Sequence, residues 1–214
     1  EALNAGFTKY TATTGIEELR KGISSFLKEK YNLNYSFQEI VLSNGGKHAL
    51  YNAIYSITEP EDEIIVFVPD WVSYLPQIEI CSCKAVLIDT TNSKFIPDIS
   101  LLQKSITPKT KAIIVNSPNN PIGCVYPKEI LEQIAKLAIE KNIFVISDEI
   151  YAPLVHEGEH VSIASLPGMK ENSIVINGFS KSHSMTGWRC GYTAAPEKIS
   201  KEIGKFQSHL TSNI

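Results

Sequence analysis

The sequence predicts a three-layer α/β/α fold around one mostly parallel, seven-stranded sheet. Seven short runs rich in β-branched residues alternate along the chain with amphipathic segments of helical periodicity. Helices separate most of these runs, and a helical crossover is the usual connection between parallel strands. Because a parallel sheet is covered on both faces, we expect the helices to form two outer layers around a doubly wound sheet.

The predicted strands are, in chain order, residues 40–42, 63–68, 85–88, 112–115, 143–147, 174–177 and 190–194. The predicted helices are residues 15–30, 46–57, 72–80, 99–105, 127–141 and 197–209. The first helix places Ile16, Leu19 and Ile23 on one face, and the fifth begins at a proline, which favours a helix start. Residues 152–172 carry Gly, Glu and Pro and are predicted to form a surface excursion.

Composition favours one large domain that binds a small molecule. The chain has 214 residues, of which 43% are hydrophobic and 20% charged, so it can bury a full core. Its net charge of -3 argues against a nucleic-acid partner or an anionic membrane surface. Its four cysteines lack CxxC spacing, and no apolar run approaches the roughly 20 residues that span a bilayer. No signal peptide is recognisable, so a cytoplasmic protein with reduced thiols is expected.

Chemistry-bearing side chains follow five of the predicted strands. These positions are 44–47, 70–71, 116–120, 148–151 and 178–181. Ligands of doubly wound sheets bind beyond the carboxyl ends of the strands. We therefore expect the five strand ends to border one crevice.

Lys181 follows the strand at 174–177 and precedes Arg189 by eight residues. Partial desolvation and a nearby cation would lower the pKa of its amine, which would then form a Schiff base with a carbonyl. Pyridoxal 5'-phosphate is the cofactor that uses this chemistry. It needs a lysine, an acid for its pyridinium nitrogen, a partner for its ring hydroxyl, an anion cradle and a stacking surface. The sequence contains a candidate for each.

Three candidates would serve the ring of this cofactor. Asp148 ends a buried strand, where a carboxylate is costly unless a donor such as a pyridinium N–H meets it. A helix cap or a structural Asp is the alternative. Tyr151 and Asn120 are candidate donors to the ring oxygen, with simple packing and an Asn-Pro turn as the alternatives.

The other candidates would serve the phosphate and the ring face. Gly46 and Lys47 follow a glycine and open a helix, where backbone N–H groups and the helix dipole favour an anion, unless the turn is an ordinary loop. Trp71 offers a flat surface for stacking or for core burial. Arg189 offers a fork that matches an oxyanion, with a surface ion pair as the alternative.

Six sequence blocks resemble the class I/II aminotransferases of fold type I, most closely the prokaryotic-type aspartate aminotransferases. They are YTATTGIEELR at 10–20, SNGGKHALYN at 43–52, PDWVSY at 69–74, NSPNNPIG at 116–123, SDEIY at 147–151 and FSKSHSMTGWRCGY at 179–192. The resemblance covers nearly the whole chain. It implies the large pyridoxal-phosphate-binding domain of the aspartate aminotransferase fold.

The resemblance also implies catalytic roles. Lys181 would be the Schiff-base lysine and then the base that moves a proton between the substrate and the cofactor. Asp148 would pair with the pyridinium nitrogen. Tyr151 and Asn120 would contact the ring hydroxyl. Trp71 would stack on the ring, and both Asn120 and Trp71 would touch the substrate.

The remaining implied roles concern the phosphate. Gly46 and Lys47 would bind it chiefly through backbone N–H groups, and Arg189 would bind it through its side chain. Tyr10 would reach the phosphate of a neighbouring subunit, so residues 1–13 are expected at the interface of a homodimer. No metal is expected at the site.

Two departures from the family pattern are visible. Gly178 stands where some relatives have a phosphate-binding serine, so Ser180 is offered in its place. The family's amino-terminal segment and its carboxyl-terminal small domain, which carries the arginine for the substrate carboxylate, have no counterpart in residues 1–214. The chain starts at Glu1 and reaches Ile214 without a capping signal, which predicts a fragment of a longer protein.

The expected activity is transfer of an amino group from an L-amino acid to a 2-oxo acid through Lys181 and pyridoxal phosphate. Two alternatives stay open. One is another fold type I reaction, such as that of a carbon–sulfur lyase. The other is a regulatory module that senses the cofactor.

Overall fold

A computed structural model describes all of residues 1–214 and contains the seven predicted strands in one sheet. The strands are β1 (Ile40–Asn44), β2 (Glu63–Val68), β3 (Lys84–Asp89), β4 (Thr110–Asn116), β5 (Phe144–Asp148), β6 (Ser173–Gly178) and β7 (Cys190–Ala194). The helices are α1 (Glu17–Tyr31), α2 (Gly46–Ile57), α3 (Tyr74–Ile80), α4 (Ile99–Ser105), α5 (Lys128–Lys141) and α6 (Glu197–Leu210). The predicted fold class is confirmed.

The sheet has the strand order β1-β7-β6-β5-β4-β2-β3 and is parallel except at β7. Strand β7 runs antiparallel to β1 and β6, because a connection that contains only the short 3₁₀ turn Thr186–Trp188, and no crossover helix, joins β6 to β7. The chain moves from β2 to β3 toward one edge and from β4 through β5 to β6 toward the other. Such a reversal opens a crevice beyond the carboxyl ends of the strands.

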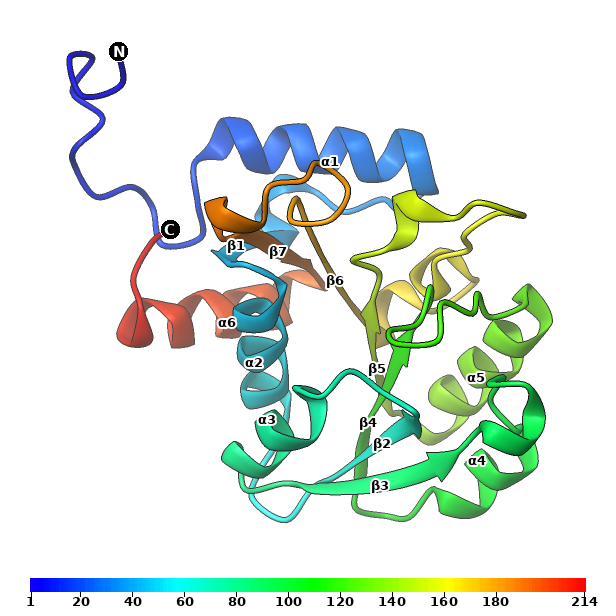
Figure 1. The fold of residues 1–214 in the computed structure, drawn as a ribbon. Helices are drawn as coiled ribbons and strands as arrows, with labels where there is room; N and C mark the ends of the chain where they lie inside the picture. The colour runs from blue at the N-terminus through cyan, green and yellow to red at the C-terminus, as the bar shows by residue number, and fades with distance from the viewer.

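Helices cover both faces of the sheet, giving three layers (Figure 1). Helices α2, α3 and α6 pack on one face, where Ala53, Ile78 and Ile203 are almost fully buried against strand residues such as Ile146. Helices α1, α4 and α5 pack on the other face in two further apolar clusters. Together these clusters fix the sheet on which the strand ends are arranged.

Three helix starts differ from the prediction, α5 by one residue and α1 and α3 by two. Helix α1 begins at Glu17 because Gly15 has a φ of 95°, outside the helical region, and Ile16 is extended. Helix α3 begins at Tyr74 because residues 72–73 form a turn in which the Tyr74 N–H donates to the Trp71 carbonyl.

The prediction of a surface excursion at 152–172 is wrong for its second half. Ile163 and Met169 are buried in the α5 side of the core, and Ser162 is 2% exposed. Three short 3₁₀ turns organise the segment, at Ala152–Leu154, Ile163–Ser165 and Lys170–Asn172. The Gly, Glu and Pro residues mark its turns, whereas its apolar residues fill the space between α5 and β6.

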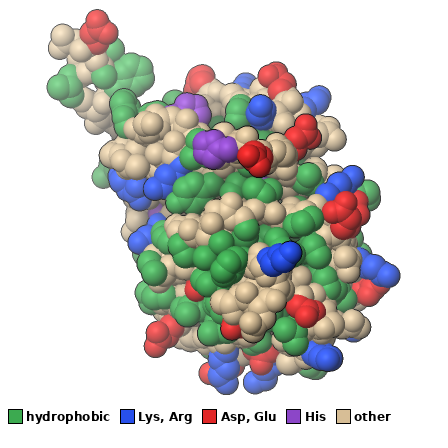
Figure 2. All heavy atoms as spheres, turned by 45° about the vertical axis from the view of Figure 1, so that its right-hand side comes forward, with side chains coloured by type: hydrophobic (Ala, Val, Ile, Leu, Met, Phe, Trp, Pro, Cys, Tyr) green, Lys and Arg blue, Asp and Glu red, His purple; other side chains and the backbone are tan.

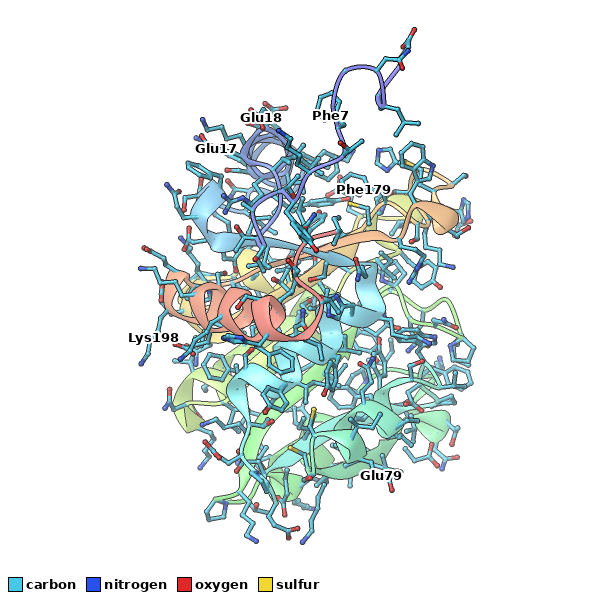
Figure 3. All side chains as sticks on the ribbon, turned by 90° about the vertical axis from the view of Figure 1, so that its left-hand side faces the viewer. Phe7, Glu17, Glu18, Glu79, Phe179 and Lys198 are labelled. Atoms are coloured by element: carbon cyan, nitrogen blue, oxygen red, sulfur yellow. The ribbon has the colours of Figure 1, made fainter.

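Residues 1–14 form an arm that projects from the body in all three views, with Phe7 labelled on it in Figure 3. Its apolar side chains are largely in solvent, and Tyr10 is 89% exposed. Acidic and basic side chains are interspersed on the face shown in Figure 2, around a broad hydrophobic area (green). No helix has the length and hydrophobicity required to cross a membrane.

Gln207 on α6 connects the base of this arm to the body. Its amide oxygen accepts from Ser43 Oγ at 2.7 Å and Asn52 Nδ2 at 2.8 Å, and its amide nitrogen donates to the carbonyls of Thr13 and Leu42, both at 2.8 Å. The side chain is fully buried.

We expect Gln207→Ala to lower the free energy of unfolding by about 3 kcal/mol, because it leaves buried polar partners unsatisfied. Urea denaturation of this variant measures the loss, and Ser208→Ala, a change at an exposed neighbouring residue, is the control. Equal midpoints for the two variants would contradict it.

Candidate active site

One cavity of about 350 Å³ lies beyond the carboxyl ends of β1, β2, β4, β5 and β6, the five strand ends that the sequence predicted to border one crevice. Its lining residues are Gly46, Lys47, Trp71, Tyr74, Asn116, Asn120, Asp148, Ile150, Tyr151, Ser180, Lys181, Thr186 and Arg189. Every predicted site residue except Tyr10 is among them. Tyr10 is in solvent and does not line this cavity.

Asp148 is a buried carboxylate that faces the cavity at the end of β5. It accepts hydrogen bonds from Tyr74 Oη at 2.8 Å and from the Ile150 N–H at 3.2 Å. Burial raises the pKa of Asp148 to about 6, although these two hydrogen bonds act in the opposite direction. No lysine, arginine or histidine forms an ion pair with it. The site therefore holds a desolvated carboxylate suited to a cationic N–H donor.

Two asparagines connect the ends of β4 and β5. Asn116 Nδ2 donates to the Asp148 carbonyl at 3.0 Å, and Asn116 Oδ1 accepts from the Asn120 N–H at 2.8 Å. Asn120 Nδ2 then donates to Tyr151 Oη at 3.3 Å. This chain of contacts places an amide and a phenol side by side at the cavity wall. The Asn-Pro pair at 120–121 is thus both a turn and part of the site.

Three cations line the cavity without a carboxylate partner. Neither Lys47, Lys181 nor Arg189 takes part in any ion pair of the structure. Lys181 Nζ lies 5.9 Å from the centre of the Tyr151 ring. Lys47 Nζ lies 5.2 Å from the centre of the half-buried Trp71 ring. The surface ion pair considered for Arg189 is absent.

Arg189 and the start of α2 form an anion cradle. Gly45, the N-cap of α2, has a φ of 82°, and a Cβ there would lie 2.5 Å from a guanidinium nitrogen of Arg189. Gly191 is equally constrained, since its Cβ would lie 2.5 Å from the Gly46 nitrogen. Arg189 donates to the carbonyls of Thr186 at 3.1 Å and Asn44 at 3.3 Å, which hold the guanidinium beside the helix N-terminus. Glycine thus allows the helix start and the cation to meet.

Sequence reasoning gave no role to Tyr74, although its hydroxyl bonds directly to Asp148. Tyr74 is 1% exposed, and burial raises the pKa of its phenol well above the ordinary value. The only signal for Tyr74 in the sequence was its position three residues after Trp71. That position fits an ordinary core residue of α3 equally well. Ile150 and Thr186 also line the cavity without having been predicted.

Comparison with known proteins identifies the family. The model of "Aminotransferase class I and II" matches residues 1–214. The chain belongs to this aminotransferase family. It is 45% identical over 213 residues to the aspartate aminotransferase of Thermotoga maritima and 41% identical over 215 residues to the aspartate/prephenate aminotransferase of Thermus thermophilus. Each alignment covers 99% of this chain.

Solved aminotransferase structures have the same fold. The aspartate aminotransferase from Thermus thermophilus with maleate superposes with a TM-score of 0.96 at 40% identity, covering 99% of this chain and 55% of that one. The aromatic aminotransferase from Pyrococcus horikoshii also gives 0.96, at 37% identity, covering 99% and 58%. The chain spans 56% and 55% of the lengths of the two curated aminotransferases named above.

Proposed function

We propose that the protein containing these residues is a pyridoxal-phosphate-dependent transaminase, which moves an amino group from an L-amino acid to a 2-oxo acid. The observation that carries the proposal is the content of one cavity. A buried carboxylate without a cationic partner and a lysine without an acidic one line the same space. Family membership supports the same conclusion.

Pyridoxal 5'-phosphate fits the donors and acceptors of the cavity. When bound, it supplies an aldehyde carbon for the amino group and a protonated ring that accepts electrons. Asp148 would accept a hydrogen bond from the ring nitrogen and keep it protonated. Tyr151 and Asn120, already within 3.3 Å of each other, would hold the ring oxygen. Trp71 would stack on the ring face.

The cradle at the start of α2 would take the phosphate. Backbone N–H groups of Gly46 and Lys47 lie at a helix N-terminus, where the dipole favours an anion. Arg189 would add a charge-assisted bond, because its guanidinium has only carbonyl partners. Ser180 also lines the cavity and would add a hydroxyl donor.

Lys181 would perform the proton transfer. Its amine would hold the cofactor's aldehyde at rest, and it would then act as the base that moves a proton between the substrate and the cofactor. Trp71 and Asn120 would contact the substrate during this transfer. The names of the relatives favour aspartate as the amino donor.

We further propose that residues 1–214 are the large cofactor-binding domain of a cytoplasmic homodimer. Residues 1–13 would lie at the subunit interface, with Tyr10 at the neighbouring subunit's phosphate. The exposure of the apolar residues on the arm supports this assignment. The four free thiols fit a reducing compartment.

The activity is tested with the full-length protein loaded with pyridoxal phosphate. Aspartate and 2-oxoglutarate should yield glutamate with ping-pong kinetics. Omitting the oxo acid should limit the reaction to one turnover for each site. Sustained release of ammonia without an acceptor would instead identify a lyase. Cofactor binding without either reaction would favour the sensing module.

A further inference from the structure

Glu149 is a buried carboxylate that faces away from the cavity. It directly follows Asp148 and is 1% exposed. Neighbouring residues at the end of a strand point to opposite faces of a sheet. Asp148 therefore faces Tyr74 on the α3 side, whereas Glu149 faces the α1 side.

Three side chains donate to this carboxylate from two parts of the chain. Glu149 Oε1 accepts from Ser147 Oγ at 2.8 Å and Ser162 Oγ at 2.6 Å. Glu149 Oε2 lies 3.1 Å from His160 Nε2, and the His160 side chain is 4% exposed. His160 Nδ1 has no partner, while the ring packs edge-on against Tyr31 at 5.6 Å. A buried acid with this many donors is held in a single position.

These contacts close a loop and fix a turn. Residues 150–159 leave the end of β5 and return at His160, so the Glu149 carboxylate ties the two ends of this loop together. The Glu149 backbone is fixed as well, since its N–H donates to the Ile176 carbonyl and its carbonyl accepts from Ala152. Asp148 and Tyr151 lie on either side of this anchor and face the cavity.

We propose that Glu149 is a positioning residue that sets the affinity of the cavity for pyridoxal phosphate, acting through Asp148 and Tyr151 without touching the cofactor. Its buried hydrogen bonds hold the turn in the geometry that receives the cofactor ring. Partners behind a ligand-holding group commonly change affinity by about tenfold to a hundredfold when removed. This inference rests on the proposed function.

The test measures the dissociation constant for pyridoxal phosphate by absorbance titration in full-length protein carrying Lys181→Ala, so that no covalent bond masks the affinity. We expect Glu149→Ala in this background to raise the dissociation constant about tenfold or more. Glu149→Gln should restore it to within about twofold, because the amide oxygen accepts from both serines and the amide nitrogen lies next to the His160 ring in place of the second carboxylate oxygen.

Glu39→Ala is the matched control. Glu39 is another buried carboxylate, 8% exposed, which binds Lys170 and the Ser36 N–H before β1, at the opposite edge of the sheet from the cavity. The Glu39→Ala substitution should lower the melting temperature without changing the dissociation constant for pyridoxal phosphate. If Glu149→Ala and Glu39→Ala both melt lower and bind the cofactor equally well, the inference is wrong.

If Glu149→Ala does not fold, His160→Ala and Ser162→Ala each remove one contact and should weaken cofactor binding severalfold; unchanged binding in both overturns the inference.

Two outcomes separate the inference from the proposed function. Failure of the parent Lys181→Ala protein and the wild-type protein to bind pyridoxal phosphate would refute the proposed function itself. Binding that is indifferent to Glu149 would refute only its positioning role.

Discussion

Replacing Lys181 by alanine should lower the rate of amino-group transfer by at least about 10⁴-fold, because the variant would lose both its bond to the cofactor and its general base. The side chain is exposed and makes no ion pair, so folding should be unaffected. Steady-state assays with aspartate and 2-oxoglutarate measure the loss. Circular dichroism checks the fold.

Lys128→Ala is a suitable control for this experiment. Lys128 is an exposed lysine at the start of α5 and pairs only with Glu132. Its removal should leave the rate unchanged within about twofold, as for most surface substitutions. A Lys181→Ala enzyme that keeps more than a tenth of the wild-type rate would show that another group transfers the proton.

Replacing Asp148 by asparagine should raise the stability of the cofactor-free protein and lower the activity of the loaded protein. In the cofactor-free protein, burial raises the pKa of Asp148 from its ordinary value to about 6. The folded state then binds more protons than the unfolded state between about pH 4 and pH 6, so this group lowers stability as the pH rises through that window. Above it the cost reaches about 3 kcal/mol, at 1.36 kcal/mol for each pKa unit.

Asp148→Asn removes this cost. Urea denaturation of the cofactor-free protein at pH 7 should therefore show a gain of up to about 3 kcal/mol, with no gain at pH 4. The loaded variant should lose activity by about 10²- to 10³-fold, because the protonated ring nitrogen loses its anionic partner. Asp89→Asn, at the exposed end of β3, is the control and should leave activity unchanged. Equal stability gains at both pH values would show that the raised pKa of Asp148 does not cause the gain.

Much of the fold and the site was predictable because local signals agreed with the global arrangement. The run before Asp148 is continuously apolar, as a central parallel strand must be, and its first polar residues mark the strand end. The same holds for β4 and β6, so the rule for strand ends located the cavity. The seven strands and six helices all appear where they were predicted, with ends displaced by at most two residues.

The features that could not be predicted depend on contacts between residues that are distant in the sequence. The partners of Glu149 at 160 and 162 lie in a segment whose Gly and Glu residues predicted a surface excursion. The Tyr74 hydroxyl meets Asp148 across 74 residues of chain, and no periodicity reports such a contact. Gln207 looks like one more polar residue on an amphipathic helix, although it is fully buried. Buried polar contacts of this kind can be identified only from the three-dimensional structure.

Chemical trapping identifies the residue that binds the cofactor. Full-length protein is incubated with pyridoxal phosphate, reduced with borohydride, digested and analysed by mass spectrometry. We predict that the phosphopyridoxyl group is found on Lys181 and that Asp148→Asn reduces its yield. Modification of Lys47 or of a surface lysine, with Lys181 unmodified, would contradict the proposal that these residues form one cofactor site.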